Sequence, residues 1–245
     1  MRIFAIIQSR MGSSRLPGKV LKKVLEKPLL EYQLERLKRC KQLTGQIVAT
    51  TYEETDDPIV DLCKHLNIPF HRGDEEDVLL RYYETAVRFK VDLVVRITSD
   101  CPLIDPTVVD EVISEYLKHP FYHYVSNTLQ RTYPRGMDIS VFPFKVLEEV
   151  HHKAIEKQDR EHVTRYIYTH SKIYKTKNVV YERDESQHRW TVDTPEDFVL
   201  IKKMLEALYP TRPNFTLEDA LDLIQNHPDW MEINAHVEQK KHDGI

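Results

Sequence analysis

The segment that decides the fold is RIFAIIQSRMGSSRLPGK, residues 2–19. Its first seven residues are rich in isoleucine and alternate little with polar residues, which is typical of a strand buried on both faces of a parallel sheet. A polar, basic loop follows. In open α/β sheets, ligands bind beyond the carboxyl ends of the strands, so this loop is the first place to expect a binding site.

Strand-like and helical segments alternate along the next hundred residues, which predicts a doubly wound, mostly parallel α/β sheet. The predicted strands are residues 46–51, 68–71 and 91–98, and the predicted helices are residues 28–40, 56–66, 76–90 and 106–117. The second half is less regular. It is expected to form strands at 121–127, 138–142, 173–181 and 189–192, and helices at 145–155, 160–170, 195–208 and 217–225. We see no repeat and no linker, so we expect one domain.

The composition excludes several classes of protein. The chain has 245 residues, of which 41% are hydrophobic and 30% charged, with a net charge of −4, so it can bury a core and is not disordered. No apolar run is long enough to span a membrane, and the apolar run near the N-terminus is too short for us to expect a secretory signal. The slight acidic excess argues against a nucleic-acid partner. Three cysteines, an odd number, favour a reducing cytoplasm, and Cys101 is expected to be a small buried side chain.

The charge is unevenly distributed. Residues 1–40 contain ten Lys or Arg and three Asp or Glu, a local balance of +7 on an otherwise acidic chain. Much of this charge is expected on solvated helix surfaces, so the prediction of an anion-binding site rests on the loop residues alone. Arg10, Arg15 and Lys19 can grip phosphate oxygens, and the Ser13 and Ser14 hydroxyls can add hydrogen bonds. Together they suit a triphosphate, with a polar surface loop as the alternative.

The loop does not match the common nucleotide-binding signatures. Five residues separate Gly12 from Gly18 where a Walker loop has four, and Val20 stands where that loop has Ser or Thr. It is also not a GxGxxG turn. The two glycines nevertheless let backbone amides approach an anion closely.

Two aspartates that follow predicted strands are the candidates for metal binding, because the neighbouring aspartates are expected to cap helices. Asp100 follows the strand at 91–98, and Asp193 follows the strand at 189–192. Magnesium in nucleotide sites is commonly held by one or two carboxylates together with phosphate oxygens, so we expect Mg²⁺ or Mn²⁺ here. Asp105, directly before Pro106, is instead expected to cap a helix. Thr194 is expected to form a capping box with Asp197, although Asp193 could itself be the cap.

Six motifs occur in order: QSRMGSSRLPGK, RGDEEDVLLRYY, RITSDCPLIDP, RGMDISVF, REHVT and WTVDTPEDF. Over about residues 1–205 they resemble the cytidylyltransferase family of the spore coat polysaccharide protein SpsF, a branch related to the acylneuraminate and KDO (3-deoxy-manno-octulosonate) cytidylyltransferases. The resemblance implies a fold of the nucleotide-diphospho-sugar transferase type. Residues 1–120 would form a nucleotide-binding half, residues 121–190 an irregular α+β extension for sugar binding and dimerisation, and residues 191–245 the closing helices.

The resemblance also implies an activity: transfer of CMP from CTP to an acidic, ulosonic-type sugar with release of pyrophosphate, in surface or spore-coat polysaccharide biosynthesis. By position, Arg10, Ser13, Ser14, Arg15 and Lys19 would bind the triphosphate, Arg96 and Thr98 would flank the nucleotide, and Asp100 and Asp193 would hold the metal. Lys19, Arg15, Asp100 and Asp193 would be catalytic. Ser140 departs from the family, which usually has Glu there.

Candidates for the sugar pocket or the dimer seam are Arg135, Asp138, Arg160, Glu161 and His162. Two other functions fit a similar sheet. A glycosyltransferase of GT-A-like fold that consumes a nucleotide sugar would need an Asp-x-Asp motif after the central strand, where this chain has Ser-Asp-Cys. A non-catalytic nucleotide-binding protein could lack either aspartate, and both are present.

Overall fold

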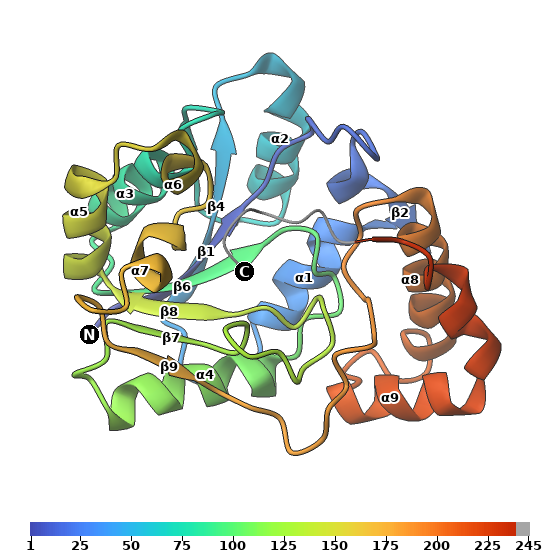
Figure 1. Cartoon of the computed structure of the whole chain (residues 1–245). Coiled ribbons are helices and arrows are strands. Elements are labelled where there is room, and N and C mark those ends of the chain that lie inside the picture. Colours follow the sequence, from blue (N-terminus) through green and yellow to red (C-terminus); the bar gives the residue numbers. More distant parts are fainter. Residues whose placement is uncertain (239–245) are drawn as a thin grey trace.

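The computed structural model describes residues 1–238 (Figure 1). Its centre is a seven-stranded sheet in the order β5-β4-β1-β6-β8-β7-β9. The strands are β1 (Ile3–Gln8), β4 (Gly45–Thr51), β5 (Phe70–Gly73), β6 (Leu93–Thr98), β7 (Tyr124–Ser126), β8 (Ser140–Pro143) and β9 (Thr176–Asn178). Among these seven, β8 alone runs antiparallel to its neighbours. A separate hairpin joins β2 (Lys23–Val24) to β3 (Lys27–Pro28).

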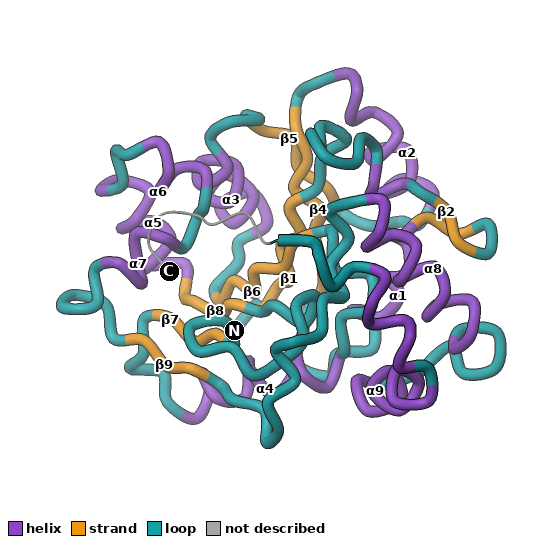
Figure 2. The backbone as a smooth tube through the Cα atoms, turned by 45° about the vertical axis from the view of Figure 1, so that its right-hand side comes forward, coloured by secondary structure: helices purple, strands orange, loops and turns teal. Residues whose placement is uncertain are grey.

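Helices cover both faces of the sheet, so the predicted doubly wound, mostly parallel α/β fold is confirmed. Figure 2 shows α3, α5, α6 and α7 on one side and α1, α2, α8 and α9 on the other. The helices are α1 (Leu29–Leu37), α2 (Asp57–His65), α3 (Val78–Phe89), α4 (Pro106–Lys118), α5 (Phe144–Lys153), α6 (Lys157–Glu161), α7 (Arg165–Thr169), α8 (Pro195–Leu208) and α9 (Leu217–Asn226). Short 3₁₀ helices are η1 (Lys19–Leu21), η2 (Glu54–Asp56) and η3 (Pro228–Ile233).

The register of the central strands places the ends of β1 and β6 side by side, where the candidate site lies. β1 lies between β4 and β6, and Gln8 at its end is level with Ala49 of β4 and Thr98 of β6. The strands are parallel, so the segments that follow Gln8 and Thr98 leave the same edge of the sheet side by side. The apolar sequence of β1 suits a central strand, because Ala5, Ile6 and Ile7 are fully buried between the two helix layers.

Two helix starts follow the predicted capping pattern. Asp105 accepts a hydrogen bond from the Thr107 amide at 2.6 Å and caps α4. Thr194 and Asp197 form a reciprocal capping box at the start of α8. Capping by Asp193 itself is therefore wrong, which leaves the Asp193 carboxylate available for the site.

Two element predictions in the second half are wrong. The expected helix at 160–170 is broken into α6 and α7, because Val163 adopts a left-handed backbone with φ of 46°. The expected strand at 189–192 does not form; only Arg189 makes an isolated bridge, with Arg135. Within residues 1–238, no helix is both long and apolar enough to cross a bilayer.

Candidate active site

A cleft of about 260 Å³ opens at the carboxyl ends of β1 and β6. The loop after β1, the turn after β6 and the segment before α8 form its walls, and α3 and α6 contribute side chains. The predicted residues that line it are Arg10, Ser13, Ser14, Arg15, Lys19, Thr98, Asp100, Glu161, His162 and Asp193. The predicted residues thus come from four segments that are far apart in the sequence and meet at one cleft.

Lys19 lies between the two predicted metal carboxylates. Its Nζ donates to Asp193 Oδ1 at 2.7 Å and to Asp100 Oδ2 at 3.2 Å. The Lys19 and Asp193 side chains are each 13% exposed, so salt and water screen these contacts less than on the surface. The structure therefore brings the basic loop and both aspartates together at one point.

The charges in this cluster shift one another's pKa values. Burial disfavours the charged form of Lys19, but Asp100 and Asp193 attract the ammonium more strongly, so the pKa of Lys19 rises above its usual value. Burial also disfavours the charged form of Asp100, but Lys19 and the Thr98 hydroxyl outweigh burial and lower the pKa of Asp100 to about 2. Both side chains are therefore charged at neutral pH.

Two arginines complete the cluster around Asp193. Arg15 Nη2 lies 3.1 Å from Asp193 Oδ2, and Arg189 Nη2 lies 2.9 Å from the same oxygen. Arg189 is also anchored by Asp197, whose Oδ1 accepts from Arg189 Nε at 2.9 Å. Sequence reasoning missed Arg189 because it assigned residues 189–192 to a strand. In an extended strand, side chains four residues apart are too distant to pair. The spacing between Arg189 and Asp193 therefore predicts an ion pair only if the chain bends between them.

Backbone hydrogen bonds hold both aspartates in place. The Val192 amide donates to the Asp100 carbonyl oxygen at 2.8 Å, which joins the segment before α8 to the turn after β6. The Asp193 amide donates to Asp197 Oδ2 at 3.0 Å, so the capping box of α8 also fixes the residue before it. The two carboxylates are therefore positioned by the fold rather than by flexible loops.

The loop after β1 is anchored by Asp56, a residue that sequence reasoning also missed. Asp56 is 1% exposed, and its Oδ1 accepts from the Met11 amide at 2.7 Å while its Oδ2 accepts from the Thr51 hydroxyl at 2.6 Å. The Met11 carbonyl in turn accepts from the amides of Ser13 and Gly18 at 2.9 and 3.0 Å. No sequence signal marks this role, because Asp56 resembles any acidic residue at a helix start.

Gly18 has a conformational reason to be glycine. Its φ of 68° lies in the left-handed region, where other residues are strained, and it immediately precedes Lys19 at the start of η1. The turn at Gly18 thereby directs Lys19 into the cleft.

Arg10 lies at the rim of the cleft and does not join the Lys19 cluster. Its Nη1 pairs with Glu75 Oε1 at 3.1 Å, and the two side chains are 46% and 41% exposed. A pair this exposed contributes little stability. Arg10 is therefore free to exchange this partner for a ligand at small cost.

Arg96 and Thr98 lie on β6 next to the cleft. Arg96 Nη2 donates to Gln8 Oε1 at 3.2 Å, and its buried Nε has no hydrogen-bond partner among the described residues. Ser140 faces Arg96 across the β6–β8 pair and bonds to the Tyr124 hydroxyl at 2.7 Å. The Thr98 hydroxyl donates to Asp100 Oδ1 and so helps to orient that carboxylate.

The sugar-pocket candidates divide into two groups. Glu161 and His162 line the cleft. Arg160, the residue before them, instead pairs with Asp77 at 2.6 Å and donates to the His151 carbonyl at 2.8 Å, so it joins α6 to α3 and α5. Arg160 therefore has structural partners and does not line the cleft.

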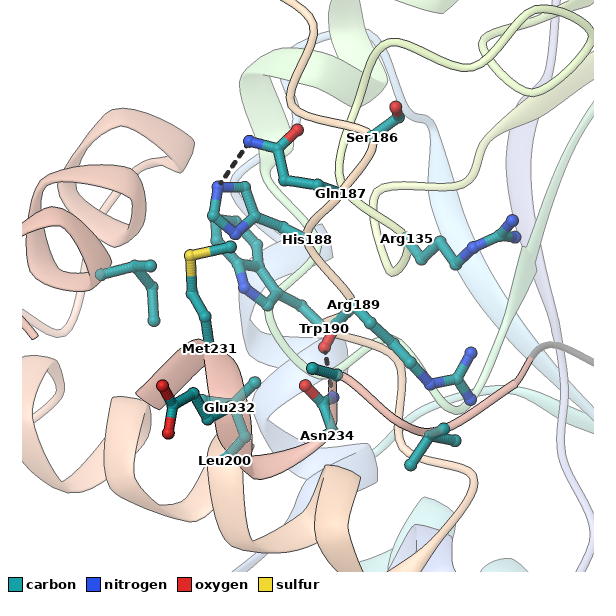
Figure 3. A pocket seen from close by; sticks show the side chains of 13 residues that line it. Arg135, Ser186, Gln187, His188, Arg189, Trp190, Leu200, Met231, Glu232 and Asn234 are labelled. Atoms are coloured by element: carbon teal, nitrogen blue, oxygen red, sulfur yellow. Dashed lines mark hydrogen bonds between the residues drawn. The ribbon is translucent and has the colours of Figure 1, made fainter. Parts of the chain in front are cut away.

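The other two candidates lie in the loop between β7 and β8. Asp138 pairs with both terminal nitrogens of Arg131, at 2.6 and 2.9 Å. Arg135 lines a second, larger cavity of about 450 Å³, together with His188, Trp190, Leu200, Met231 and Asn234 (Figure 3). Figure 3 shows the Arg135 and Arg189 side chains extending in the same direction, away from His188. Arg189 thus belongs to the wall of this cavity and to the charged cluster.

The donor set fits a hard divalent cation that a nucleotide helps to bind. Asp100 and Asp193 supply carboxylate oxygens within reach of one ammonium nitrogen, so they are close enough to share a cation. Over residues 1–238, no group of three or more His, Cys, Asp or Glu side chains is arranged to hold a metal. The protein alone therefore offers too few ligands for a closed metal cage, but enough for Mg²⁺ that keeps phosphate and water ligands.

The fold and the site define a nucleotide-binding α/β transferase, and comparisons with known proteins make the class more specific. A family model described as cytidylyltransferase matches residues 4–240. The spore coat polysaccharide biosynthesis protein SpsF of Bacillus subtilis is 32% identical over 235 residues, covering 93% of this chain and 95% of that protein. A 3-deoxy-manno-octulosonate cytidylyltransferase of Geobacter sulfurreducens is 32% identical over 122 residues, covering 49% of this chain and 47% of that protein.

A solved structure supports the same assignment. The chain is similar to a cytidylyltransferase from Leptospira borgpetersenii, with a TM-score of 0.91 and 32% identity over 99% of this chain and 100% of that one. The chain belongs to the cytidylyltransferase family, and it is a nucleotidyltransferase enzyme. This decides against both alternatives, the glycosyltransferase and the non-catalytic binding protein.

Proposed function

We propose that the protein transfers CMP from CTP to an acidic, ulosonic-type sugar and releases pyrophosphate. The observation that carries the proposal is the meeting of Lys19, Asp100 and Asp193 at the carboxyl edge of the sheet. The similarity to SpsF and to a 3-deoxy-manno-octulosonate cytidylyltransferase supports a sugar acceptor and surface or spore-coat polysaccharide biosynthesis as the pathway.

The basic loop would hold the triphosphate. Of the three cations on the loop, Lys19 and Arg15 are the less exposed. Arg10 lies at the rim of the cleft and pairs with the exposed Glu75. In the reaction, an acceptor hydroxyl would release its proton to solvent and its oxygen would bond to the α-phosphorus. The bond from that phosphorus to the α–β bridging oxygen would break, and pyrophosphate would leave with that oxygen. Lys19 and Arg15 would stabilise the charge that develops on the departing pyrophosphate, which is the main contribution a protein makes to phosphoryl-type transfer.

Asp100 and Asp193 would hold Mg²⁺ or Mn²⁺. When bound, the cation would neutralise charge on the nucleotide phosphates and help to orient the attacking hydroxyl. The contribution of the chain is to hold the two carboxylates close together: Val192 fixes the Asp100 backbone and the α8 capping box fixes Asp193.

The acceptor would lie on the side of the cleft lined by Glu161 and His162, with Arg96 nearby through its contact with the lining residue Gln8. No carboxylate pairs with Arg96 among the described residues, and its Nε is buried without a hydrogen bond. Arg96 is half-buried, and its Nη2 has only the neutral Gln8 amide oxygen as a partner, which an anionic ligand could replace. This supports an acceptor that carries an acid group.

We further propose a cytoplasmic homodimer assembled through residues 121–190. In support of a dimer, this region exposes large apolar side chains, including Ile155 at 86% and Phe121 at 58%. In support of a reducing compartment, all three cysteines are free thiols. Light scattering coupled to gel filtration tests the dimer: a monomer at micromolar concentration would rule it out.

The function is tested by pyrophosphate release. CTP, UTP, ATP and dTTP would each be paired with acidic sugars, neutral sugars and sugar phosphates in the presence of Mg²⁺. We expect release with CTP and an acidic sugar, and loss of release when EDTA removes the metal. Release with UTP alone, or with neutral sugars alone, would contradict the proposed substrates.

A further inference from the structure

The ammonium group of Lys19 occupies the point between the two carboxylates assigned to the metal. Its Nζ contacts Asp193 Oδ1 at 2.7 Å and Asp100 Oδ2 at 3.2 Å. A cation held between the two carboxylates would approach these same two oxygens. Lys19 and a divalent cation therefore compete for one position.

The other two carboxylate oxygens are also engaged. Asp193 Oδ2 forms an ion pair with Arg15 at 3.1 Å and accepts a hydrogen bond from Arg189 at 2.9 Å. Asp100 Oδ1 accepts from the Thr98 hydroxyl. Each of the four oxygens thus has a polar or cationic partner, and a metal shared by both carboxylates would have to displace Lys19 from between them.

The charges of the cluster are balanced without a metal. Asp100, Asp193 and Asp197 carry three negative charges, and Lys19, Arg15 and Arg189 carry three positive charges. A divalent cation that entered alone would leave two uncompensated positive charges in a site where Lys19 is only 13% exposed. Uncompensated charge in a poorly solvated site is strongly unfavourable.

A nucleotide triphosphate removes both obstacles, because it brings negative charge and new acceptors for Lys19 and Arg15. Arg15 lies on the loop and is 28% exposed, so it can move to a phosphate. Arg189 is 8% exposed and is held by Asp197 through two hydrogen bonds, so it stays and keeps Asp193 in position. Lys19 and Arg15 can therefore leave the carboxylates for the phosphates, whereas Arg189 stays bound to Asp193 and Asp197.

We infer that Lys19 reserves the metal position in the nucleotide-free protein, so that the divalent cation enters only with the nucleotide whose phosphates draw Lys19 away. The inference rests on the proposed metal site. It assigns Lys19 a second task besides binding phosphate: Lys19 couples metal binding to nucleotide binding and keeps the empty enzyme from binding divalent cations.

Titration of the full-length protein with Mn²⁺ in the absence of nucleotide tests the inference, with free Mn²⁺ measured from its electron paramagnetic resonance signal. Lys19→Met removes the ammonium, and Lys19→Gln removes its charge while keeping a hydrogen-bond donor. Lys22→Met is the matched control, because Lys22 lies in the same segment and stacks over Phe198 at 5.4 Å. Circular dichroism and thermal unfolding confirm that each variant is folded.

We expect Lys19→Met and Lys19→Gln to bind Mn²⁺ at least about tenfold more tightly than the wild type, a typical size for coupling between two sites. Lys22→Met should match the wild type. Adding Asp193→Asn to Lys19→Met should abolish the gain, because the site then loses one carboxylate. Equal Mn²⁺ affinity in the wild type and both Lys19 variants would overturn the inference, as would a gain that survives Asp193→Asn.

The failure of the proposed function gives a different result. It would appear as wild-type protein that releases no pyrophosphate from CTP with any acidic sugar, whatever the Mn²⁺ affinity of the Lys19 variants. Tight nucleotide-free Mn²⁺ binding by an active wild-type enzyme would instead contradict the coupling role of Lys19 alone.

Discussion

Replacing Asp100 by Asn is the substitution that most sharply separates catalysis from folding in this protein. Asn has the same shape, and its oxygen can still accept from the Thr98 hydroxyl. Its amide nitrogen, however, would face the Lys19 ammonium where the carboxylate oxygen lies 3.2 Å away. The variant therefore removes one negative charge from the cluster while it leaves the backbone contacts of residue 100 unchanged.

The size of the effect comes from the carboxylate charge that would act on the cation and the phosphates in the loaded site. Opposite unit charges about 3 Å apart interact by about 5 kcal/mol at the effective dielectric constant of a partly buried site. Part of this is kept, because the carboxylate of Asp193 remains. We expect kcat to fall by about 10³-fold, equivalent to about 4 kcal/mol of transition-state stabilisation.

The assay is pyrophosphate release at saturating CTP and acceptor over a range of Mg²⁺ concentrations. Asp61→Asn is the matched control, since Asp61 is 73% exposed and lies on α2. It should keep wild-type kcat. Thermal unfolding of both variants separates lost chemistry from lost structure. A folded Asp100→Asn variant with kcat within about threefold of the wild type would refute the placement of Asp100 at the reacting phosphates.

Three further predictions test the site and its frame. Lys19→Ala should raise KM for CTP and also lower kcat, because the ammonium would contact the phosphates before and during reaction; steady-state kinetics that change only the acceptor KM would contradict this role. Asp105→Ala should lower the free energy of unfolding by about 1–3 kcal/mol, since Asp105 caps α4 and also accepts from the Leu217 amide, and urea denaturation measures this loss. The thiols of Cys40, Cys63 and Cys101 are buried, which raises their pKa values, so iodoacetamide should leave all three unmodified in the native protein and label them in urea; rapid native labelling of Cys101 would point to a reactive thiol.

Local signals in the sequence were sufficient for the main strands and helices of the first half of the fold, although not for the β2–β3 hairpin. The apolar run of β1 and the Asp105-Pro106 pair each carry their meaning in a few neighbouring residues. The placement of Asp100 also followed, because residues at the carboxyl ends of neighbouring parallel strands reach the same edge of a sheet. Such features can be predicted from one sequence, because they depend only on the periodicity of apolar residues and on the position of a residue within a helix or strand. Asp193 reaches the same point although the strand expected before it does not form, because the Val192 amide bonds to the Asp100 carbonyl.

Features that depend on contacts between distant segments were not predictable. Asp56 anchors the loop after β1 across 45 residues, and its identity alone does not reveal this. The break between α6 and α7 occurs at Val163, a residue type that rarely adopts a positive φ, and no Gly or Pro marks it. The expected strand at 189–192 is reduced to one bridge between Arg189 and Arg135, and the Arg189 guanidinium pairs with Asp193 and Asp197.

Anomalous diffraction from crystals grown with CTP and Mn²⁺ is the most direct measurement of how loop, carboxylates and nucleotide come together. We expect one strong manganese peak within bonding distance of the carboxylates of residues 100 and 193, with the Lys19 ammonium turned toward the phosphates. A manganese ion bound elsewhere, or a triphosphate that avoids the loop of residues 10–19, would contradict the account.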